Sequence, residues 1–354
     1  MGFPLVMLLF IFLWRIYRKE AQRLEFLLAG FCLALLPLVH ASSFGVALGM
    51  SICVFAISGL KERKLQRNWL IFLLPVILIA LPQLMFINEQ QRSDNFFGTQ
   101  PGWMSKAKSI DDGNIFIKFW LDNAGLTLIL GVIGLFFLKR DQLFFALPLL
   151  MLFVLANLIR FQPWEWDNTK ALMYWYFALA ALAAIALQKG YLMMARKNKP
   201  IGVATILALA SICIFSGILS LVYWNSSGAQ LWSASDIRVA SFIAASTPRD
   251  AVFAAAGKHN HIVYTLAGRQ ILAGYDGHLW SHGLIYSEQS SDNRQILASG
   301  DLALMKKWNI SYVYIGYAET NEYGANMDLF LNNKAAFSEI LEAEGGRIRI
   351  FKVN

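Results

Sequence analysis

Residues 160–170 hold the densest group of polar and aromatic side chains in the sequence. Two cations and two carboxylates alternate with two indoles, and the set is Arg160, Trp164, Glu165, Trp166, Asp167 and Lys170. Cationic side chains can hold a phosphate, and a carboxylate can act as the base for a sugar hydroxyl or bind a divalent metal. The alternative is structural, with tryptophans at a membrane interface, Asp167 or Asn168 capping a helix and Lys170 extended toward water.

A single histidine, His40, stands in a short stretch between two apolar runs. Imidazole changes its charge near neutral pH, so His40 is a candidate general base or ligand. A lone histidine at a helix end is also commonly a local hydrogen-bond partner. The sequence leaves both roles open.

Four of the five histidines fall within residues 259–282. His278 and His282 have the i, i+4 spacing that can place two imidazoles on one metal ion when the segment is helical. Gly277 and Gly283 favour a loop instead, and no HExxH motif accompanies the pair. We therefore assign no metal site here, although a divalent metal remains compatible with the carboxylates of residues 160–170.

The same histidine-rich region supplies three predicted substrate contacts. Arg269, Trp280 and His282 combine a cation, an indole and an imidazole within 14 residues. We expect this segment to return to the membrane domain and to place these side chains over the mouth of a cavity there.

The composition predicts a membrane protein. Of 354 residues, 57% are apolar and 15% are charged, whereas soluble domains carry about 25% charged residues. Mean hydropathy is +0.48, so a soluble cytosolic enzyme is not expected. The net charge of +8 does not indicate nucleic-acid binding, because the basic residues fall in short clusters between apolar runs.

Eight apolar runs predict about eight transmembrane helices in a domain covering residues 1–224. The runs are 3–14, 24–39, 42–60, 69–87, 123–138, 142–159, 171–188 and 200–224. Several are shorter than the roughly 20 residues that a spanning helix needs, so we expect tilted helices or helices extended by polar flanks.

The loop charges predict the orientation of these helices. Residues 1–224 contain 20 Lys and Arg, and 14 of these fall in the alternate loops 15–23, 61–67, 139–140 and 189–199. By the positive-inside rule these loops are cytoplasmic. The sequence therefore predicts an integral protein of the cytoplasmic membrane with both termini outside the cytoplasm.

Residues 225–354 predict a small extracytoplasmic α/β domain, since helical and strand patterns alternate there. Helices are expected at 233–247, 289–299, 301–308 and 326–343, with Ser235 or Asp236 as a cap of the first. Strands are expected at 251–256, 262–266, 270–273, 312–316 and 347–353.

Several of these segments resemble the C-terminal part of bacterial GT-C membrane glycosyltransferases, in the group of protein mannosyltransferases and aminoarabinose transferases. The resemblance covers nearly the whole chain and rests on 35–44, 163–170, 266–269, 274–283 and 312–316. It implies transfer of a sugar from a polyprenyl-phosphate donor to an acceptor at the outer membrane face. Arg160 and Lys170 are then expected at the phosphate, Trp164 and Trp166 in substrate binding, and Glu165, Asp167 or His40 in catalysis, with no organic cofactor.

The sequence departs from that pattern in one place. The GT-C base is an acidic residue in the first outer loop, and the corresponding loop around His40 and Ala41 has no carboxylate. One expectation is that an N-terminal part carrying this acid is missing from the chain. The alternatives are a non-catalytic membrane scaffold or assembly protein and a transporter, for which the plainest helix break is Pro75.

Overall fold

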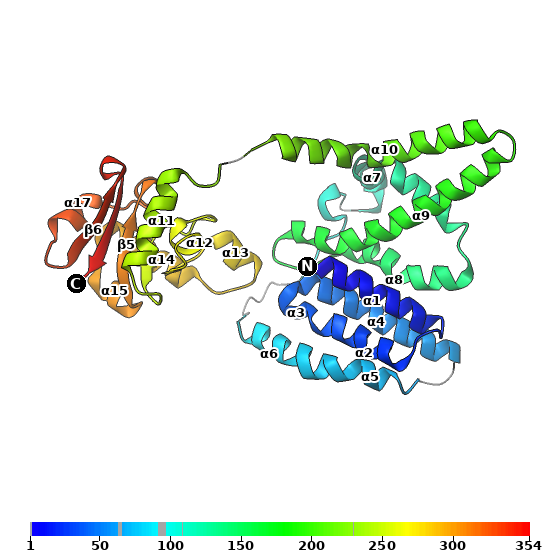
Figure 1. The fold of residues 1–354 in the computed structure, drawn as a ribbon, viewed down its shortest axis with the longest axis horizontal. Helices are drawn as coiled ribbons and strands as arrows, with labels where there is room; N and C mark the ends of the chain where they lie inside the picture. The colour runs from blue at the N-terminus through cyan, green and yellow to red at the C-terminus, as the bar shows by residue number, and fades with distance from the viewer. Residues whose placement is uncertain (1, 63–65, 91–96, 108, 229) are drawn as a thin grey trace. The chain divides into compact units, whose positions relative to one another are not determined.

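The structure is a computed structural model that describes residues 2–62, 66–90, 97–107, 109–228 and 230–354. The chain divides into two compact units, an N-terminal unit of Met1–Ser226 and a C-terminal unit of Ser227–Asn354. The chain is mostly helical, and its sheet lies at the C-terminal end of the sequence (Figure 1).

The N-terminal unit is built from helices that follow the apolar runs. They are α1 (Gly2–Tyr17), α2 (Arg23–Ala34), α3 (Leu36–Val39), α4 (Ala41–Glu62), α5 (Trp69–Pro75), α6 (Leu81–Gln90), α7 (Gly113–Leu135), α8 (Arg140–Ala156), α9 (Thr169–Ala195) and α10 (Lys199–Ser226). Two short strands, β1 (Gly98–Thr99) and β2 (Ile159–Arg160), pair antiparallel, and single helical turns form at Trp103–Ser105, Ile110–Asp112 and Glu165–Asn168.

Five segments of the described chain are long and apolar enough to cross a membrane. They are Ala41–Lys61, Trp69–Asn88, Gly113–Leu135, Glu165–Ala195 and Lys199–Ser226. The expected number of eight is not confirmed. Helices α1 and α8 have only 16 and 17 residues, and the run 24–39 is interrupted at Leu35 between α2 and α3.

The helix interruption at Leu35 is stabilised by a side chain from another helix. Gln83 of α6 donates from Nε2 to the Ala34 carbonyl at 3.1 Å and accepts from the Leu38 N–H at 3.2 Å. Backbone groups left unpaired at a helix break need such partners away from water. By contrast, Pro75 does not end its helix, because the chain continues as a π-helical turn over Val76–Ala80.

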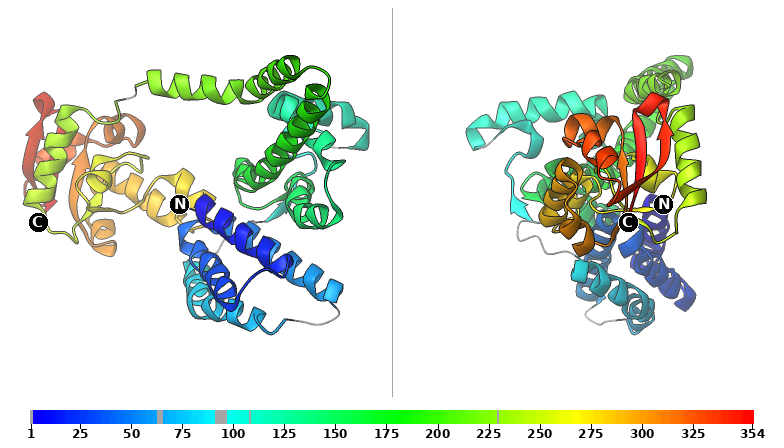
Figure 2. Two further views of the ribbon diagram at one scale, coloured as in Figure 1. Left: turned by 45° about the vertical axis from the view of Figure 1, so that its right-hand side comes forward. Right: turned by 90° about the vertical axis from the view of Figure 1, so that its left-hand side faces the viewer.

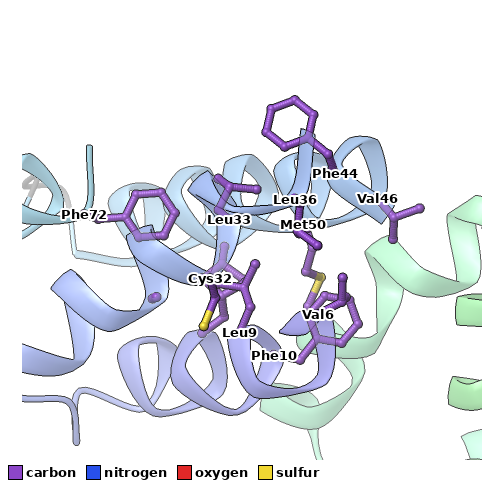
Figure 3. Packing of buried hydrophobic residues seen from close by; sticks show 14 of the residues in the cluster. Val6, Leu9, Phe10, Cys32, Leu33, Leu36, Phe44, Val46, Met50 and Phe72 are labelled. Atoms are coloured by element: carbon purple, nitrogen blue, oxygen red, sulfur yellow. The ribbon is translucent and has the colours of Figure 1, made fainter. Parts of the chain in front are cut away.

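Helices α1, α2, α4 and α5 pack around one apolar core. Figure 3 shows Val6 and Phe10 of α1 beside Met50 of α4. Close helix contact depends on small residues: a Cβ on Gly30 of α2 would lie 2.2 Å from the Phe72 carbonyl oxygen of α5. Small residues that let helix backbones approach are typical of packing in membranes.

Three of the loops rich in Lys and Arg meet at one end of the N-terminal unit. Tyr17 at the end of α1 and Lys61 near the end of α4 both bond to Asp141 at the start of α8, at 3.3 and 2.9 Å. These three loops therefore lie together, as one face of a membrane would require. Arg63 and Lys64, assigned by sequence to the same loops, lie outside the described residues.

The C-terminal unit is organised around a sheet that, in the described residues, has five strands in the order β4-β3-β5-β7-β6. The strands are β3 (Val252–Ala254), β4 (Gln270–Ile271), β5 (Ile310–Ile315), β6 (Phe337–Ala343) and β7 (Ile348–Val353). Strands β4, β3 and β5 are parallel, whereas β7 runs antiparallel to both β5 and β6.

Helices cover both faces of this sheet. They are α11 (Ala234–Ser246), α12 (Ile262–Thr265), α13 (Asp276–Ser281), α14 (Ser287–Ser299), α15 (Leu302–Lys307), α16 (Tyr317–Glu322) and α17 (Met327–Asn332), with a single turn at Glu344–Gly346. Residues of α11 and α12 share one apolar core with the sheet, and residues of α14, α15 and α17 share another. Figure 2 shows α11, in yellow-green, and the orange helices α15 and α17 on opposite sides of the red strands.

Three local predictions in this unit are wrong. Residues 262–266 form helix α12 rather than a strand, because His261 accepts a hydrogen bond from the Val263 N–H and starts a helical turn. The helix expected over 326–343 ends at Asn332, and after a turn Phe337–Ala343 forms β6. Pairing with β7 outweighs the helix propensity of the Leu, Glu and Ala residues there. The cap of α11 is Ser233, not Ser235 or Asp236.

Candidate functional site

An apolar groove of about 600 Å³ lies between α4 and α8. On α4 its lining repeats every fourth residue with small side chains, at Ala41, Gly45, Gly49 and Cys53, and on α8 the lining includes Leu147, Met151 and Leu155. A Cβ added at Gly45 or Gly49 would meet no described atom within 4 Å, so the groove is open there. From Ala41 to Ile57 it extends about 24 Å along the helix axis.

One end of this groove is polar. Ser42, Gln162 and Asp167 line that end, and Gln162 donates from Nε2 to Ser42 Oγ at 2.6 Å. Asp167 is only 8% exposed and pairs with Lys170 at 3.0 Å, whereas the Lys170 side chain is 39% exposed. The groove therefore combines a long apolar channel with a carboxylate and an adjacent cation, the chemistry that an amphiphile with an anionic head would meet.

His40 belongs to a hydrogen-bond chain beside this end. Its Nδ1 lies 2.6 Å from Ser43 Oγ, which in turn lies 2.5 Å from the Tyr174 hydroxyl. Burial, and next the charge of Lys170, lowers the pKa of His40, so the imidazole is neutral at pH 7. His40 is thus close enough to sense Lys170, and its Nδ1 is bonded to the Ser43 hydroxyl, which links the ring to Tyr174.

The loop that carries Asp167 is fixed by Asn168. This fully buried amide donates to the Ala156 and Ile159 carbonyls at 2.9 and 2.7 Å and accepts from the Phe161 N–H at 3.0 Å. Neither Asp167 nor Asn168 caps α9 with its side chain, because the turn Glu165–Asn168 runs directly into that helix. The cap alternative is therefore wrong, and Asp167 is left to pair with Lys170.

The tryptophans and Glu165 lie on the outer side of the same loop. Trp164 and Trp166 are each 49% exposed, as interfacial aromatic residues are. The Glu165 carboxylate accepts from the Gln100 side chain, and its backbone carbonyl accepts from Trp103 Nε1 at 2.8 Å. Glu165 thus fastens the loop to the segment after β1, and the groove lining among described residues does not include it.

Arg160 lies in β2 beside β1. A Cβ on Gly98 would come within 3.1 Å of the Arg160 guanidinium, so the side chain lies across β1. The structure thus brings together Asp167, Lys170 and His40 at the groove end. It places Arg160 on the adjoining strand β2 and Glu165 in the turn before α9, in contact with Gln100 and Trp103.

The remaining predicted residues belong to the C-terminal unit. Arg269 is 8% exposed and donates to Thr247 Oγ1 and to the carbonyls of Ala244, Thr247 and Ala267. Its guanidinium therefore closes the C-terminal end of α11, and this contact gives Arg269 a structural role. Trp280 and His282 are exposed, on and just after α13.

The histidine-rich segment forms a short helix rather than a loop, and His282 Nδ1 lies 2.8 Å from the His278 carbonyl. The rings of His259 and His278 are 4.6 Å apart. Burial, and next the two neighbouring histidines, lowers the pKa of His278. Among described residues, no group of three or more His, Cys, Asp or Glu side chains is placed to hold a metal ion.

Sequence reasoning missed the uncharged partners of the groove end. Gln162, Ser42, Ser43 and Tyr174 carry no charge and fit no motif, so their roles emerge only when three segments of the chain meet. Their one sequence signal is polarity at the edge of an apolar run. A scan against models of known protein families finds no match for this chain, and no curated protein matches it.

Proposed function

We propose that the protein is a membrane glycosyltransferase that moves a sugar from a polyprenyl-phosphate donor to an acceptor hydroxyl. One observation carries this proposal: the groove between α4 and α8 is apolar for about 24 Å and ends at Asp167, beside Lys170. A polyprenyl phosphate has the matching shape, with a long apolar chain and an anionic head.

The surface of the N-terminal unit supports a membrane location. The most apolar window of α10 has none of its residues buried, and an exposed apolar patch of that size in water would aggregate. With the basic loops gathered at the Asp141 end, the positive-inside rule places that end in the cytoplasm. The groove end, the C-terminal unit and both termini then lie outside.

The pairing of Asp167 with Lys170 suggests how the chemistry is controlled. A donor phosphate competes for the Lys170 ammonium and leaves the buried Asp167 carboxylate free to accept a proton. The acceptor oxygen attacks the anomeric carbon and gives its proton to Asp167. The bond from that carbon to the phosphate oxygen breaks, and the phosphate leaves with both electrons, stabilised by Lys170.

The activity test uses the chain in phospholipid nanodiscs with polyprenyl-phosphate mannose and polyprenyl-phosphate glucose as donors. We expect Lys170→Gln and Asp167→Asn to lower transfer by roughly 30- to 1000-fold, the loss that follows removal of one transition-state partner. Lys189→Gln, a matched change at the other end of α9, is the control. Wild-type protein that binds these donors without transferring sugar would support the scaffold alternative instead.

The groove is tested by filling it. Gly49→Leu places a side chain in the open channel, whereas Gly217→Leu places the same side chain on α10, where a Cβ also meets no described atom. We expect Gly49→Leu to weaken binding of fluorescent polyprenyl phosphate by at least about tenfold and Gly217→Leu to leave it unchanged. Equal binding by both variants would exclude the groove as the donor site.

The orientation is tested by labelling cysteines in a variant whose three native cysteines are replaced by serine. We expect Ser227→Cys to react with an impermeant thiol reagent in intact cells and Gln66→Cys to react only after permeabilisation. Ser287→Cys, at the exposed start of α14, provides a second outside position. Labelling of Gln66→Cys in intact cells would reverse the orientation.

A further inference from the structure

A second cavity, of about 820 Å³, lies in the C-terminal unit. It forms where β3 and β5 end, and its lining comes from 231–236, 258–262, 314–321 and 344–348. These two strands are adjacent and parallel in the sheet, with β4 on the other side of β3 and β7 on the other side of β5. Crevices outside the carboxyl ends of parallel strands are the usual ligand sites of open α/β sheets, and the volume is within the range of about 300–1,000 Å³ for such sites.

The floor of this cavity already contains an anion. Glu319, 1% exposed, accepts hydrogen bonds from the N–H groups of Ala256 and Gly316 at 2.7 and 2.9 Å and lies 2.8 Å from His261 Nε2. Burial acts to raise the pKa of Glu319, but the His261 contact and the backbone donors outweigh it, so the pKa is lowered. The backbone donors that would hold a ligand phosphate are therefore occupied by a carboxylate of the chain itself.

Above Glu319, the hydroxyl of a buried tyrosine opens into the cavity. Tyr314 is 6% exposed and lines the cavity, and its hydroxyl has no hydrogen bond to another described residue. The absence of a side chain at Gly316 makes room for it, since a Cβ there would lie 3.0 Å from the hydroxyl. Burial raises the pKa of Tyr314, so the phenol stays protonated and can donate. Because no side chain of the described residues bonds this hydroxyl, a ligand in the cavity can supply its hydrogen-bond partner.

The rim of the cavity is aromatic and carries both charges. Tyr317 is 80% exposed at the edge of the cavity. Trp232 also lines the cavity, and donation from its Nε1 to the Asn260 carbonyl at 3.0 Å holds it in place. Glu344 and Arg347 both contribute to the lining, so no single charge dominates. Flat aromatic faces combined with short polar side chains suit a ligand with apolar C–H faces and many hydroxyls.

We propose that this cavity binds a neutral saccharide, with the Tyr314 hydroxyl as a buried hydrogen-bond partner and Tyr317 as a stacking surface. Nucleotides and nucleotide sugars are disfavoured because Glu319 occupies the position of their phosphate. The site goes beyond the proposed function, since saccharide binding by the C-terminal unit requires no donor and no transfer.

The test is saturation-transfer NMR on the full chain in phospholipid nanodiscs, which avoid detergents with sugar head groups. The probes are cellotriose, maltotriose, mannotriose and chitotriose, with UDP-glucose and inorganic phosphate as anionic comparisons. We expect at least one neutral trisaccharide to bind and the two anions not to bind. Binding of UDP-glucose or phosphate alone, or no saturation transfer to any trisaccharide, would overturn the proposal.

Two variants locate the binding. Tyr314→Phe removes one neutral hydrogen bond and should weaken the affinity about five- to tenfold, whereas Tyr312→Phe, equally buried on the same strand but outside the cavity, should not. Tyr317→Ala should also weaken binding. Because the Tyr317 side chain is highly exposed, its removal should not disturb folding, so weaker binding would not be due to misfolding. Unchanged affinity in both Tyr314→Phe and Tyr317→Ala would place the saccharide elsewhere. Lys170→Gln should keep saccharide binding, which separates this result from failure of the proposed transfer.

Discussion

The two units use polar side chains in opposite ways. In the N-terminal unit, the pair Asp167 and Lys170 stands at one end of an apolar groove, and Lys170 is still 39% exposed. In the C-terminal unit, the carboxylate of Glu319 is buried beneath the sheet edge with three hydrogen-bond partners. The comparison indicates that polar contacts in the first unit are left available for a ligand, whereas Glu319 is held in place as part of the fold.

The strongest test of this difference between the two units is to replace Glu319. Glu319→Gln keeps the shape but places an amide N–H opposite donors of Ala256, Gly316 or His261, so we expect a loss of about 2–4 kcal/mol in the stability of the C-terminal unit. The measurement is urea denaturation read by pulse proteolysis. Glu322→Gln, which removes an exposed pair with Lys258, is the matched control and should cost at most about 1 kcal/mol. Similar losses in both variants would contradict the special role of Glu319.

The same carboxylate predicts a pH dependence. The pKa of Glu319 is lower in the folded than in the unfolded chain. Its contribution to the free energy of unfolding is therefore fully present above the unfolded pKa, about 4.3, and is lost as the pH falls through the folded pKa. We expect the stability difference between wild type and Glu319→Gln to shrink as the pH is lowered from neutral into this acidic range. A constant difference across that range would show that Glu319 is not ionised in the folded state.

Helix packing in the N-terminal unit should respond to added volume instead. A Cβ on Gly134 of α7 would lie 2.1 Å from the Leu182 carbonyl oxygen of α9. We expect Gly134→Ala to destabilise the unit by about 1–3 kcal/mol, seen as a lower midpoint of thermal denaturation in nanodiscs. Gly217→Ala on α10 meets no described atom and should be neutral or slightly stabilising. Equal midpoints for the two variants would mean that α7 and α9 are not so closely packed.

The smallest expected effect concerns helix caps. Asp301 Oδ1 accepts hydrogen bonds from the N–H groups of Ala303 and Leu304 at 2.9 and 3.1 Å and so starts α15, whereas α9 starts without a side-chain cap. Asp301→Ala should cost about 1 kcal/mol, and Asp301→Asn should retain most of the stability because asparagine caps as well. The urea midpoint of the C-terminal unit is the readout. A full loss in Asp301→Asn would point to the contact with Gln295 rather than to the cap.

Much of the local architecture could be predicted from the sequence. Apolar runs longer than about 17 residues predict helices long enough to cross a membrane, and the runs at 42–60 and 200–224 are helical over nearly those bounds. Short patterns were less informative. Residues 262–266 and 337–343 have ambiguous propensities. A hydrogen bond from the Val263 N–H to His261 decides the first segment, and pairing with β7 decides the second.

The candidate site was only partly readable. The composition of residues 160–170 identifies them as a candidate site. The sequence could not distinguish the role of Asp167, which lines the groove, from that of Glu165, which binds Gln100 and holds the loop. It also suggested Arg269 as a phosphate contact, although that guanidinium closes α11. Charge and residue type show what a side chain can do, and its partners decide which of these roles it has.

By itself, the sequence determined the helical apolar half, the α/β half and the clustering of basic loops, because hydrophobicity and charge act over short stretches of chain. The groove beside Asp167 and the cavity above Glu319 were decided only by the tertiary structure. The groove joins segments more than 100 residues apart, as the contact of Gln162 with Ser42 shows. The cavity joins segments more than 50 residues apart, as the contact of Glu319 with His261 shows. No local pattern encodes such contacts, since they form only when packing brings distant helices and strand ends to one place.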